Sequence, residues 1–286
     1  PNPSPSRGGG FPAAKLLWSA GMTYRFTILG CGSSGGVPRI GMNWGQCDAS
    51  NPKNRRTRCS ALVERMSPSG QTAALIDTSP DFREQILAIR LMALDGVIYT
   101  HDHADHTHGI DDLRMVAYAM KKRVDVYFDA KTGDSLKRRF EYCFKTPDGS
   151  SYSPILNAHG IDGVAPFEIL GAGGPIPVLP VPQVHGDITS LGFRFSNLAY
   201  SPDISNLSDG SASLLEGLDV WVVDALRYTP HESHFNVKQA LKWIERLKPK
   251  RAVLTHMTSD LDYETLCREL PDGVEPAYDG MVLEYS

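Results

Sequence analysis

The chain has 286 residues, 41% of them hydrophobic, which is enough to bury the core of one large domain or of two modest ones. This composition excludes a disordered or fibrous protein. Its 29 lysine and arginine residues against 33 acidic residues give a formal net charge of −4, which argues against a protein that coats nucleic acid. We therefore expect a partner that is small or that is bound over a small area, and no extended nucleic-acid binding.

Other sequence patterns indicate the cellular compartment of the protein and the natural start of its chain. No apolar run approaches the roughly 20 residues of a membrane span, so no membrane association is expected. The five cysteines are scattered without a CxxC pair, which favours a reducing cytoplasm. Residues 1–21, rich in Pro, Gly and Ser, are expected to form a disordered extension, with Met22 as a candidate natural start. Residues 22–286 are expected to form one domain, and the sequence is compatible with a homodimer.

In the first half of the domain, short β-rich runs alternate with helical patterns. Strands are expected at 24–29, 60–64, 73–77 and 96–99, with a helix at 80–93 whose first turn suits Pro80. After a strand at 124–128, residues 129–165 are interpreted as an insertion between two half-domains. Its basic and aromatic side chains could form a lid over a pocket, although aromatic residues at helical spacing are more often core.

The second half repeats this alternation. Strands are expected at 167–170, 176–184, 191–195, 198–200, 218–223 and 251–255, and an amphipathic helix at 236–247. Two successive halves of this kind indicate two sheets packed face to face with helices outside. The fold class is therefore α/β, with four layers.

The loop after the strand at 96–99 carries four metal-binding groups within six residues. They are His101, His103, Asp105 and His106. Imidazole and carboxylate suit zinc, manganese or iron, and four such groups can contribute to two ion sites from one loop. A lone HxH would be read as a solvated polar loop, so the interpretation depends on ligands from elsewhere.

Three later residues of ligand type each follow an apolar strand. His185 ends the run 181–184, Asp203 follows 198–202 and His256 follows 252–255. Each alone would be an ordinary strand-end residue. Together with the histidine-rich loop they predict one pocket at a shared edge of the sheets.

This order of residues resembles the metallo-β-lactamase superfamily, whose HxHxDH motif is followed by a lone His, an Asp and another His. The resemblance runs from about residue 24 to the C-terminus and implies the αββα fold. It also implies two divalent ions, zinc or manganese with iron as the alternative. The implied ligands are His101, His103 and His185 for the first ion, Asp105, His106 and His256 for the second, and Asp203 as the bridge.

The segments 30–38, 55–60 and 77–83 resemble the phosphodiesterase branch of this superfamily, which includes phosphoribosyl cyclic phosphodiesterases and, more distantly, tRNase Z. Glycines let backbone N–H groups approach an anion, so Ser33 and Ser34 are substrate candidates. In the cyclic phosphodiesterase a cysteine-rich segment holds a structural zinc, whereas this stretch has only Cys47 and Cys59. These two are interpreted as free thiols, and a further metal site there stays open.

Three other residues are candidates beside the ligands. Asp77 resembles the family's early Asp, which supports the metal loop, but it equally suits a helix entrance before Pro80. His234 resembles the branch's non-ligand histidine near the metals, with a helix-entrance role as the alternative. Arg227, which follows a predicted strand, could orient a phosphate or form a surface ion pair.

The sequence thus predicts a binuclear hydrolase that cleaves a phosphodiester, in a small nucleotide-like or ribose cyclic phosphate, with a metal-bridging hydroxide. The catalytic residues would be Asp105, which orients the hydroxide, and His234, which protonates the leaving group or holds a phosphoryl oxygen. The alternatives are a thioester or lactam hydrolase on the same metal centre, a tRNase Z-like nuclease, and a non-enzymatic metal or nucleotide sensor. The acidic charge weighs against the nuclease.

Overall fold

A computed structural model describes residues 23–285, so the expectation for residues 1–21 and the start at Met22 lie outside the described residues. Within them the chain forms two seven-stranded sheets. The first has the order β14 (Met281–Tyr285), β1 (Thr23–Gly30), β2 (Ser60–Ser67), β3 (Gly70–Ile76), β4 (Gly96–Ile98), β5 (Val124–Phe128), β6 (Leu156–Gly160). The second has the order β13 (Val274–Pro276), β12 (Arg251–Thr255), β11 (Val220–Asp224), β10 (Leu198–Ser201), β9 (Ile188–Phe195), β8 (Ile176–His185), β7 (Phe167–Ile169).

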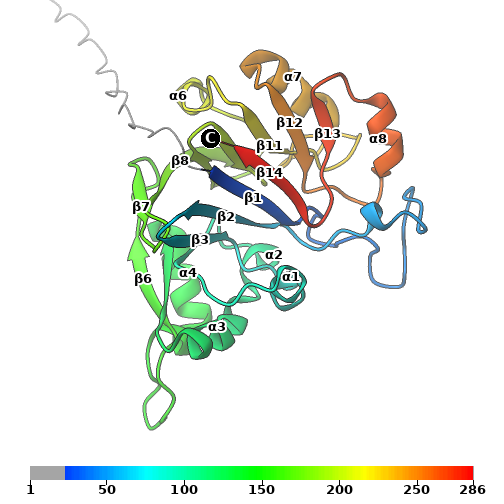
Figure 1. Ribbon diagram of the computed structural model, residues 1–286. Helices are drawn as coiled ribbons and strands as arrows, with labels where there is room; N and C mark the ends of the chain where they lie inside the picture. The colour runs from blue at the N-terminus through cyan, green and yellow to red at the C-terminus, as the bar shows by residue number, and fades with distance from the viewer. Residues whose placement is uncertain (1–22, 286) are drawn as a thin grey trace, which may run out of the picture.

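Helices cover the outer faces of both sheets (Figure 1). Beside the first sheet lie α1 (Phe82–Ile89), α2 (Ala104–Thr107), α3 (Leu113–Met120), α4 (Ala130–Arg139) and α5 (Glu141–Phe144). Beside the second lie α6 (Asp209–Ser213), α7 (Val237–Leu247) and α8 (Tyr263–Glu269). Short 3-10 turns occur at Pro52–Asn54 and Ile110–Asp112. No helix in the described part of the chain is long and apolar enough to span a membrane.

Side chains of the first sheet point alternately to its two faces, and each face contributes to a different hydrophobic core. Phe26 and Ile28 of β1 face inward and join Trp221 and other residues of the second sheet in the core between the sheets. On the other face of the first sheet, Leu62 and Leu75 pack with residues of the helices, such as Phe82. The predicted four-layer αββα fold is thus confirmed, because each sheet buries one face on the other sheet and the outer faces lie under helices.

Parallel strands bring several strand ends to one edge of each sheet. In the first sheet β3 to β6 run parallel, and in the second β10 to β13 do. The remaining pairs, including β8 with β9, are antiparallel. Residues that follow β4, β10, β11 and β12 can therefore meet, as expected for loops at the carboxyl ends of parallel strands.

Most predicted strands and the helix at 236–247 occur close to their expected bounds. The helix begins after Asn236, which forms a reciprocal capping box with Gln239. The helix expected at 80–93 is shorter than the apolar pattern suggested, because Arg90 adopts φ 55 and ends α1. The expected insertion, 129–165, contains α4, α5 and β6, and β6 is the edge strand of the first sheet. A lid role for the remaining loop stays a prediction.

Candidate metal centre

The histidine-rich loop follows β4 and runs into α2. His101 lies just after the strand, His103 occupies the N-cap position of α2, and Asp105 and His106 lie within the helix. His106 is fully buried and His101 is nearly so, whereas Asp105 keeps some solvent contact. The guanidinium of Arg139 on α4 donates to the carbonyl oxygen of Asp102 at 2.6 Å, which ties the loop to the helical layer.

The second sheet contributes one residue from each of several strand ends. His185 is the last residue of β8, Asp224 is the last residue of β11, and Asp203 lies two residues after β10. His256 directly follows β12 with φ 56, a left-handed conformation that is uncommon for residues other than glycine. All four side chains are buried.

These residues converge on two adjoining groups of potential metal ligands. The ligand atoms of His101, His103 and His185 lie within 4.8 Å of one another, and so do those of Asp105, His106 and His256. Both sets are the trios that the family resemblance implied. Asp203 lies between them: its carboxylate is 3.0 Å from His106 Nε2, 3.5 Å from His256 Nε2, 3.7 Å from His185 Nε2 and 4.0 Å from His101 Nε2.

The donor atoms fit divalent ions. Within residues 23–285, the buried ring nitrogens His101 Nε2 and His256 Nε2 have no hydrogen-bond partner, and His106 Nε2 and Asp203 Oδ2 face each other at 3.0 Å without hydrogen-bond geometry. An orphaned buried polar atom is costly unless something else binds it. His185 Nε2 and His103 Nδ1 lie 3.3 Å apart, and two nitrogens bound to one tetrahedral zinc ion are separated by about 3.3 Å.

The charges of the cluster also favour cations. Asp77, Asp203 and Asp224 are almost completely buried, and Asp105 lies beside them. Burial holds the pKa of His101 well below its usual range and lowers that of His185 to about 4, so both rings are neutral near pH 7. A neutral imidazole can donate a lone pair, and bound divalent ions would balance the buried carboxylates.

Neighbouring groups fix the orientation of the candidate ligands. His106 donates from Nδ1 to Asp77 at 2.7 Å, and Asp77 also accepts from the Thr100 N–H and hydroxyl at 2.8 Å each. His185 donates from Nδ1 to the Ser233 carbonyl at 2.6 Å. Both Nε2 atoms are thereby left with a lone pair toward the cluster, as carboxylate and carbonyl partners do for metal-binding histidines. Asp77, with φ 63, therefore braces the loop and is not a helix cap.

His234 lies beside these groups and has a carboxylate of its own. Its Nδ1 donates to Asp224 at 2.8 Å, and its ring stacks on His256 with centroids 4.6 Å apart. Burial lowers the pKa of His234 from its usual value. The sequence pattern that singled out Asp203 and His256, a polar residue after an apolar strand, applies equally to Asp224, which joins His234 and His256 in a third group of potential ligands.

The remaining candidates surround the cluster less closely. Ser34 lines a cavity of about 500 Å³ that Asp105 also lines, whereas Ser33 is buried and its N–H donates to the Met257 carbonyl. The guanidinium of Arg227 donates to the carbonyls of Thr229 and Pro230, so it supports the loop that leads to His234. Direct substrate contacts of Ser33 and Arg227 stay predictions.

The two cysteines after the Gly-rich segment lie apart from any group of potential ligands among residues 23–285. Both are buried free thiols. Cys47 Sγ contacts the carbonyls of Ser259 and Leu261, and Cys59 Sγ contacts Thr255 Oγ1. These contacts agree with the interpretation of both residues as free thiols.

Comparison with known proteins agrees with the fold. The family described as "Beta-lactamase superfamily domain" matches residues 72–257. The chain therefore belongs to the β-lactamase superfamily. It is also similar to the crystal structure of a new diphosphatase from the PhnP family, with 36% identity, a TM-score of 0.82 and coverage of 92% of this chain and 98% of that one. This likeness supports the phosphodiesterase branch predicted from the sequence.

Two curated relatives extend the comparison. An octanoyltransferase of Porphyromonas gingivalis is 31% identical over 261 residues, which cover 90% of this chain and 51% of the relative. The chain thus spans about half the length of that protein. Coenzyme PQQ synthesis protein B of Nitrosococcus oceani is 25% identical over 312 residues, with coverage of 89% and 97%.

Proposed function

We propose that this protein is a binuclear metal-dependent phosphodiesterase that hydrolyses a small nucleotide-like or ribose cyclic phosphate. The observation that carries the proposal is the pair of adjoining ligand trios with the Asp203 carboxylate between them. Zinc or manganese would be held by His101, His103 and His185 in one trio and by Asp105, His106 and His256 in the other. The solved diphosphatase at 36% identity supports phosphoryl rather than acyl chemistry.

Two divalent ions would lower the pKa of water and polarise the phosphoryl group. The protein's own groups would do the rest. Asp105, at the cavity side of the cluster, can accept a hydrogen bond from the attacking water and orient it. His234 is held by Asp224 in one tautomer and can hold a phosphoryl oxygen or, once protonated, give a proton to the leaving oxygen. An approaching phosphoryl anion favours the protonated ring and offsets the effect of burial on its pKa.

A substrate panel tests the proposal directly. Metal-loaded protein is assayed with a ribose cyclic phosphate, bis(4-nitrophenyl) phosphate, a precursor tRNA, a β-lactam and an acyl thioester, and the metal content is measured in parallel. We expect the highest kcat/KM for a phosphodiester and two divalent ions per chain. The proposal fails if metal-loaded protein cleaves no phosphodiester, and multiple turnover on any member of the panel rejects a sensor that only binds.

Acyl thioester hydrolysis is the second candidate. The observation that favours it is the relative named octanoyltransferase, although this chain matches only about half of that protein. A metal centre of this kind would polarise an acyl carbonyl as well as a phosphoryl group. If the thioester in the panel has the highest kcat/KM, the reaction changes while the fold and the ligand trios remain.

A further inference from the structure

Arg56 is a buried charge that lies outside the two ligand trios. Its side chain is only 1% exposed, its Nε has no hydrogen-bond partner among residues 23–285, and none of its hydrogen bonds there is to a carboxylate. A guanidinium stays charged, and burying a charge without an ion-pair partner is costly. We propose that Arg56 is a positioning residue, which holds His256 in place for the ion of the trio Asp105, His106 and His256. The inference rests on the proposed two-ion centre.

The backbone at His256 needs support from its surroundings. With φ 56, this residue has a left-handed conformation, which costs free energy and persists only where neighbouring structure fixes it. The two residues that follow are held from different directions. The Met257 N–H donates to the Cys31 carbonyl at 2.9 Å, and the Thr258 N–H donates to the Leu226 carbonyl at 2.9 Å. Contacts of residues 257 and 258 therefore determine where the imidazole points.

The Arg56 guanidinium makes one of these contacts. Its Nη1 donates to the Thr258 carbonyl at 3.1 Å, and its Nη2 donates to Asn54 Oδ1 at 3.3 Å. Asn54 Oδ1 also accepts from the Tyr263 N–H at 2.8 Å. The backbone of Arg56 is fixed in turn, because it exchanges two hydrogen bonds with Val37 at 2.8 and 2.9 Å. The side chain thus ties Thr258, two residues after the histidine, to a rigid part of the first half of the molecule.

The two segments that Arg56 joins are closely packed. Residues 43–56 lie against residues 257–263, which lead into α8 (Figure 1). The Gln46 N–H donates to the Ser259 carbonyl at 2.8 Å. Gly45 has φ 55, and a Cβ at this position would lie 2.6 Å from the same carbonyl oxygen. A side chain at position 45 would therefore separate the segments and move the backbone that follows His256.

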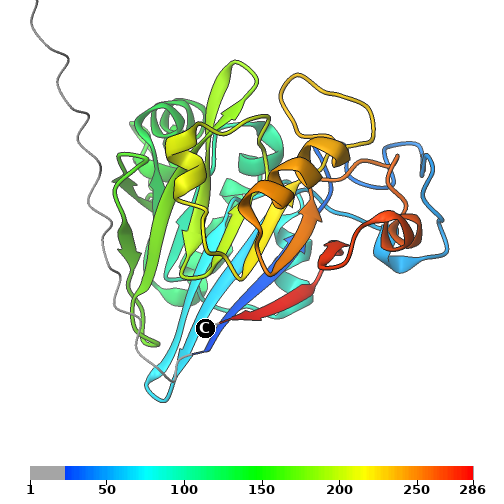
Figure 2. The same cartoon turned by 90° about the horizontal axis from the view of Figure 1, so that it is seen from above.

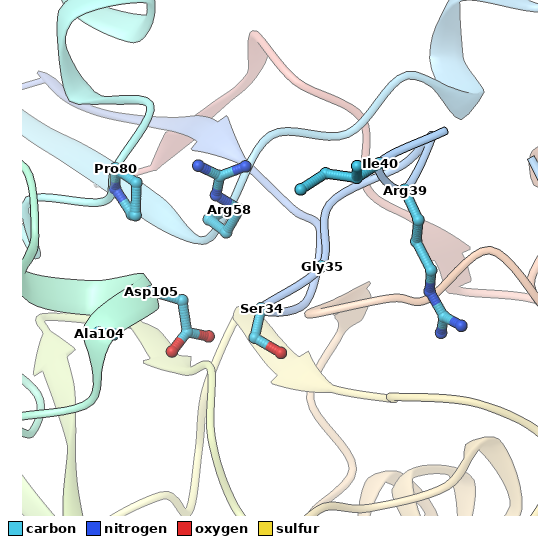
Figure 3. Close-up of a pocket in the computed structure, with 8 residues that line it drawn as sticks. All are labelled: Ser34, Gly35, Arg39, Ile40, Arg58, Pro80, Ala104 and Asp105. Carbon is cyan, nitrogen blue, oxygen red and sulfur yellow. The ribbon is translucent and has the colours of Figure 1, made fainter. Parts of the chain in front are cut away.

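Arg56 does not act by touching the substrate. Figure 3 shows Arg58, two residues further on, at the cavity that Asp105 also lines, where a substrate can reach it. Arg56 is not among the residues that line this cavity, and its terminal nitrogens are directed at a carbonyl and a side-chain amide. Its effect on the metal centre passes through Thr258 and His256.

Titration of metal-free protein with Co²⁺ tests the inference without turnover, with the visible absorption of the bound ion as the readout. We expect the wild type to bind two ions. Arg56→Gln should bind the ion of the trio with His256 about 10- to 100-fold more weakly, the usual effect of removing a group that orients a metal ligand. The ion held by His101, His103 and His185 should keep its affinity. His106→Ala, which lacks a ligand of the affected trio, identifies the spectrum of this remaining ion.

Two matched variants separate positioning from the loss of a charge. Arg55→Gln removes the same charge from an exposed neighbour and should bind both ions as the wild type does. Arg56→Lys keeps the charge and can still donate to the Thr258 carbonyl, so it should recover part of the affinity that Arg56→Gln loses. If Arg56→Gln does not fold, Gly45→Ala tests the same link at Ser259 and should weaken the same ion.

Each outcome decides a different point. Equal weakening of both ions in Arg56→Gln, or unchanged binding of both, overturns the inference even if phosphodiesters are hydrolysed. Selective weakening of one ion, in a protein that hydrolyses no phosphodiester, supports the inference and overturns only the proposed reaction. A wild type that binds fewer than two Co²⁺ ions overturns the two-ion centre and the inference with it.

Discussion

The two sheets supply the candidate metal centre in different ways. The first sheet contributes a contiguous motif, in which His101 to His106 follow a single strand and enter one short helix. The second contributes single residues from the ends of β8, β10, β11 and β12. A local motif can form its geometry from neighbouring residues, whereas separate strand ends meet only when the whole sheet has formed. We therefore expect substitutions in the second sheet to disturb both metal sites and those in the first to act more locally.

Asp203 gives the largest expected effect. Asp203→Ala removes the carboxylate that approaches histidines of both trios, so both ions should be depleted and activity should fall by about 10⁴-fold or more. Elemental analysis of the purified variant measures the loss. Asp105→Asn, in the first-sheet motif, is the matched comparison and should retain more metal. Equal depletion in the two variants would contradict the proposed difference between the sheets.

His234 should separate chemistry from metal binding. His234→Ala should keep both ions and lower kcat by about 10²–10⁴-fold for a substrate with a poor leaving group, the usual contribution of general acid catalysis. An activated aryl phosphodiester needs no proton and should lose much less.

The control for His234 is His231→Ala, which removes an exposed histidine whose ring lies 5.2 Å away on the same loop and should have little effect. Equal losses of His234→Ala on both substrates would reject the acid role and leave charge stabilisation. Loss of metal in His234→Ala would make this residue a ligand.

Asp279 joins the end of the chain to the first half, and its protonation should change stability. It accepts from the backbone N–H groups of Cys31 and Thr57 at 3.0 and 2.7 Å. Burial raises its pKa from 3.8 to about 6. Between these values the folded protein keeps a proton that the unfolded chain has lost, so the free energy of unfolding falls as pH rises from about 4 to 6.

Asp279→Asn cannot ionise and should lack this slope. Relative to the variant, the wild type should lose about 3 kcal/mol of stability between pH 4 and pH 7, since each pKa unit corresponds to about 1.4 kcal/mol. Urea unfolding of both proteins across this pH range measures the difference between their free energies of unfolding. The contributions of other titrating groups are the same in both proteins and cancel in this difference. Parallel curves would show that Asp279 titrates normally.

Asp77 gives the smallest expected effect. Asp77→Asn keeps an acceptor for His106 and tolerates φ 63, but it removes the negative charge behind the imidazole. Metal affinity should fall by about 10- to 100-fold, as measured by competition with a chelator. Asp95→Asn provides the control, because Asp95 accepts from the Ala73 N–H at the far end of the adjacent strands. Complete loss of metal from Asp77→Asn would show that the first-sheet motif is less independent than we infer.

The comparison of the sheets also explains what the sequence could reveal. The HxHxDH motif is local, and its later partners could be placed because each follows an apolar run. Asp224 shows the same pattern, because it ends the otherwise apolar strand Val220–Asp224. Its role beside His234, however, depends on a hydrogen bond between residues ten positions apart, and no periodicity in the sequence indicates that contact. Arg58 could not be identified as a cavity residue, because its position depends on Asp81 and on the turn at Gly36.

The elements that the sequence analysis did not predict also fall into two groups, those with a local sequence pattern and those that depend on tertiary contacts. β14 has strictly alternating burial, and this period-two pattern was present in the sequence. β6, with the sequence LNAHG, buries little apolar surface and forms because β5 offers a parallel edge. α3 was recognisable by its apolar side chains, whereas α4 has few of them and depends on capping by Asp129 and on packing of Leu136.

The pairing of β1 with β14 has a consequence for folding during synthesis. Tyr24 lies opposite Tyr285 in the register, and Figure 2 shows the two strands side by side. One edge of β1 therefore stays unpaired on the ribosome until the segment 281–285 emerges. β2, which pairs with the other edge of β1, emerges much earlier. An exposed edge strand invites pairing with other chains, so this interval is when the nascent protein is most open to aggregation and to chaperones.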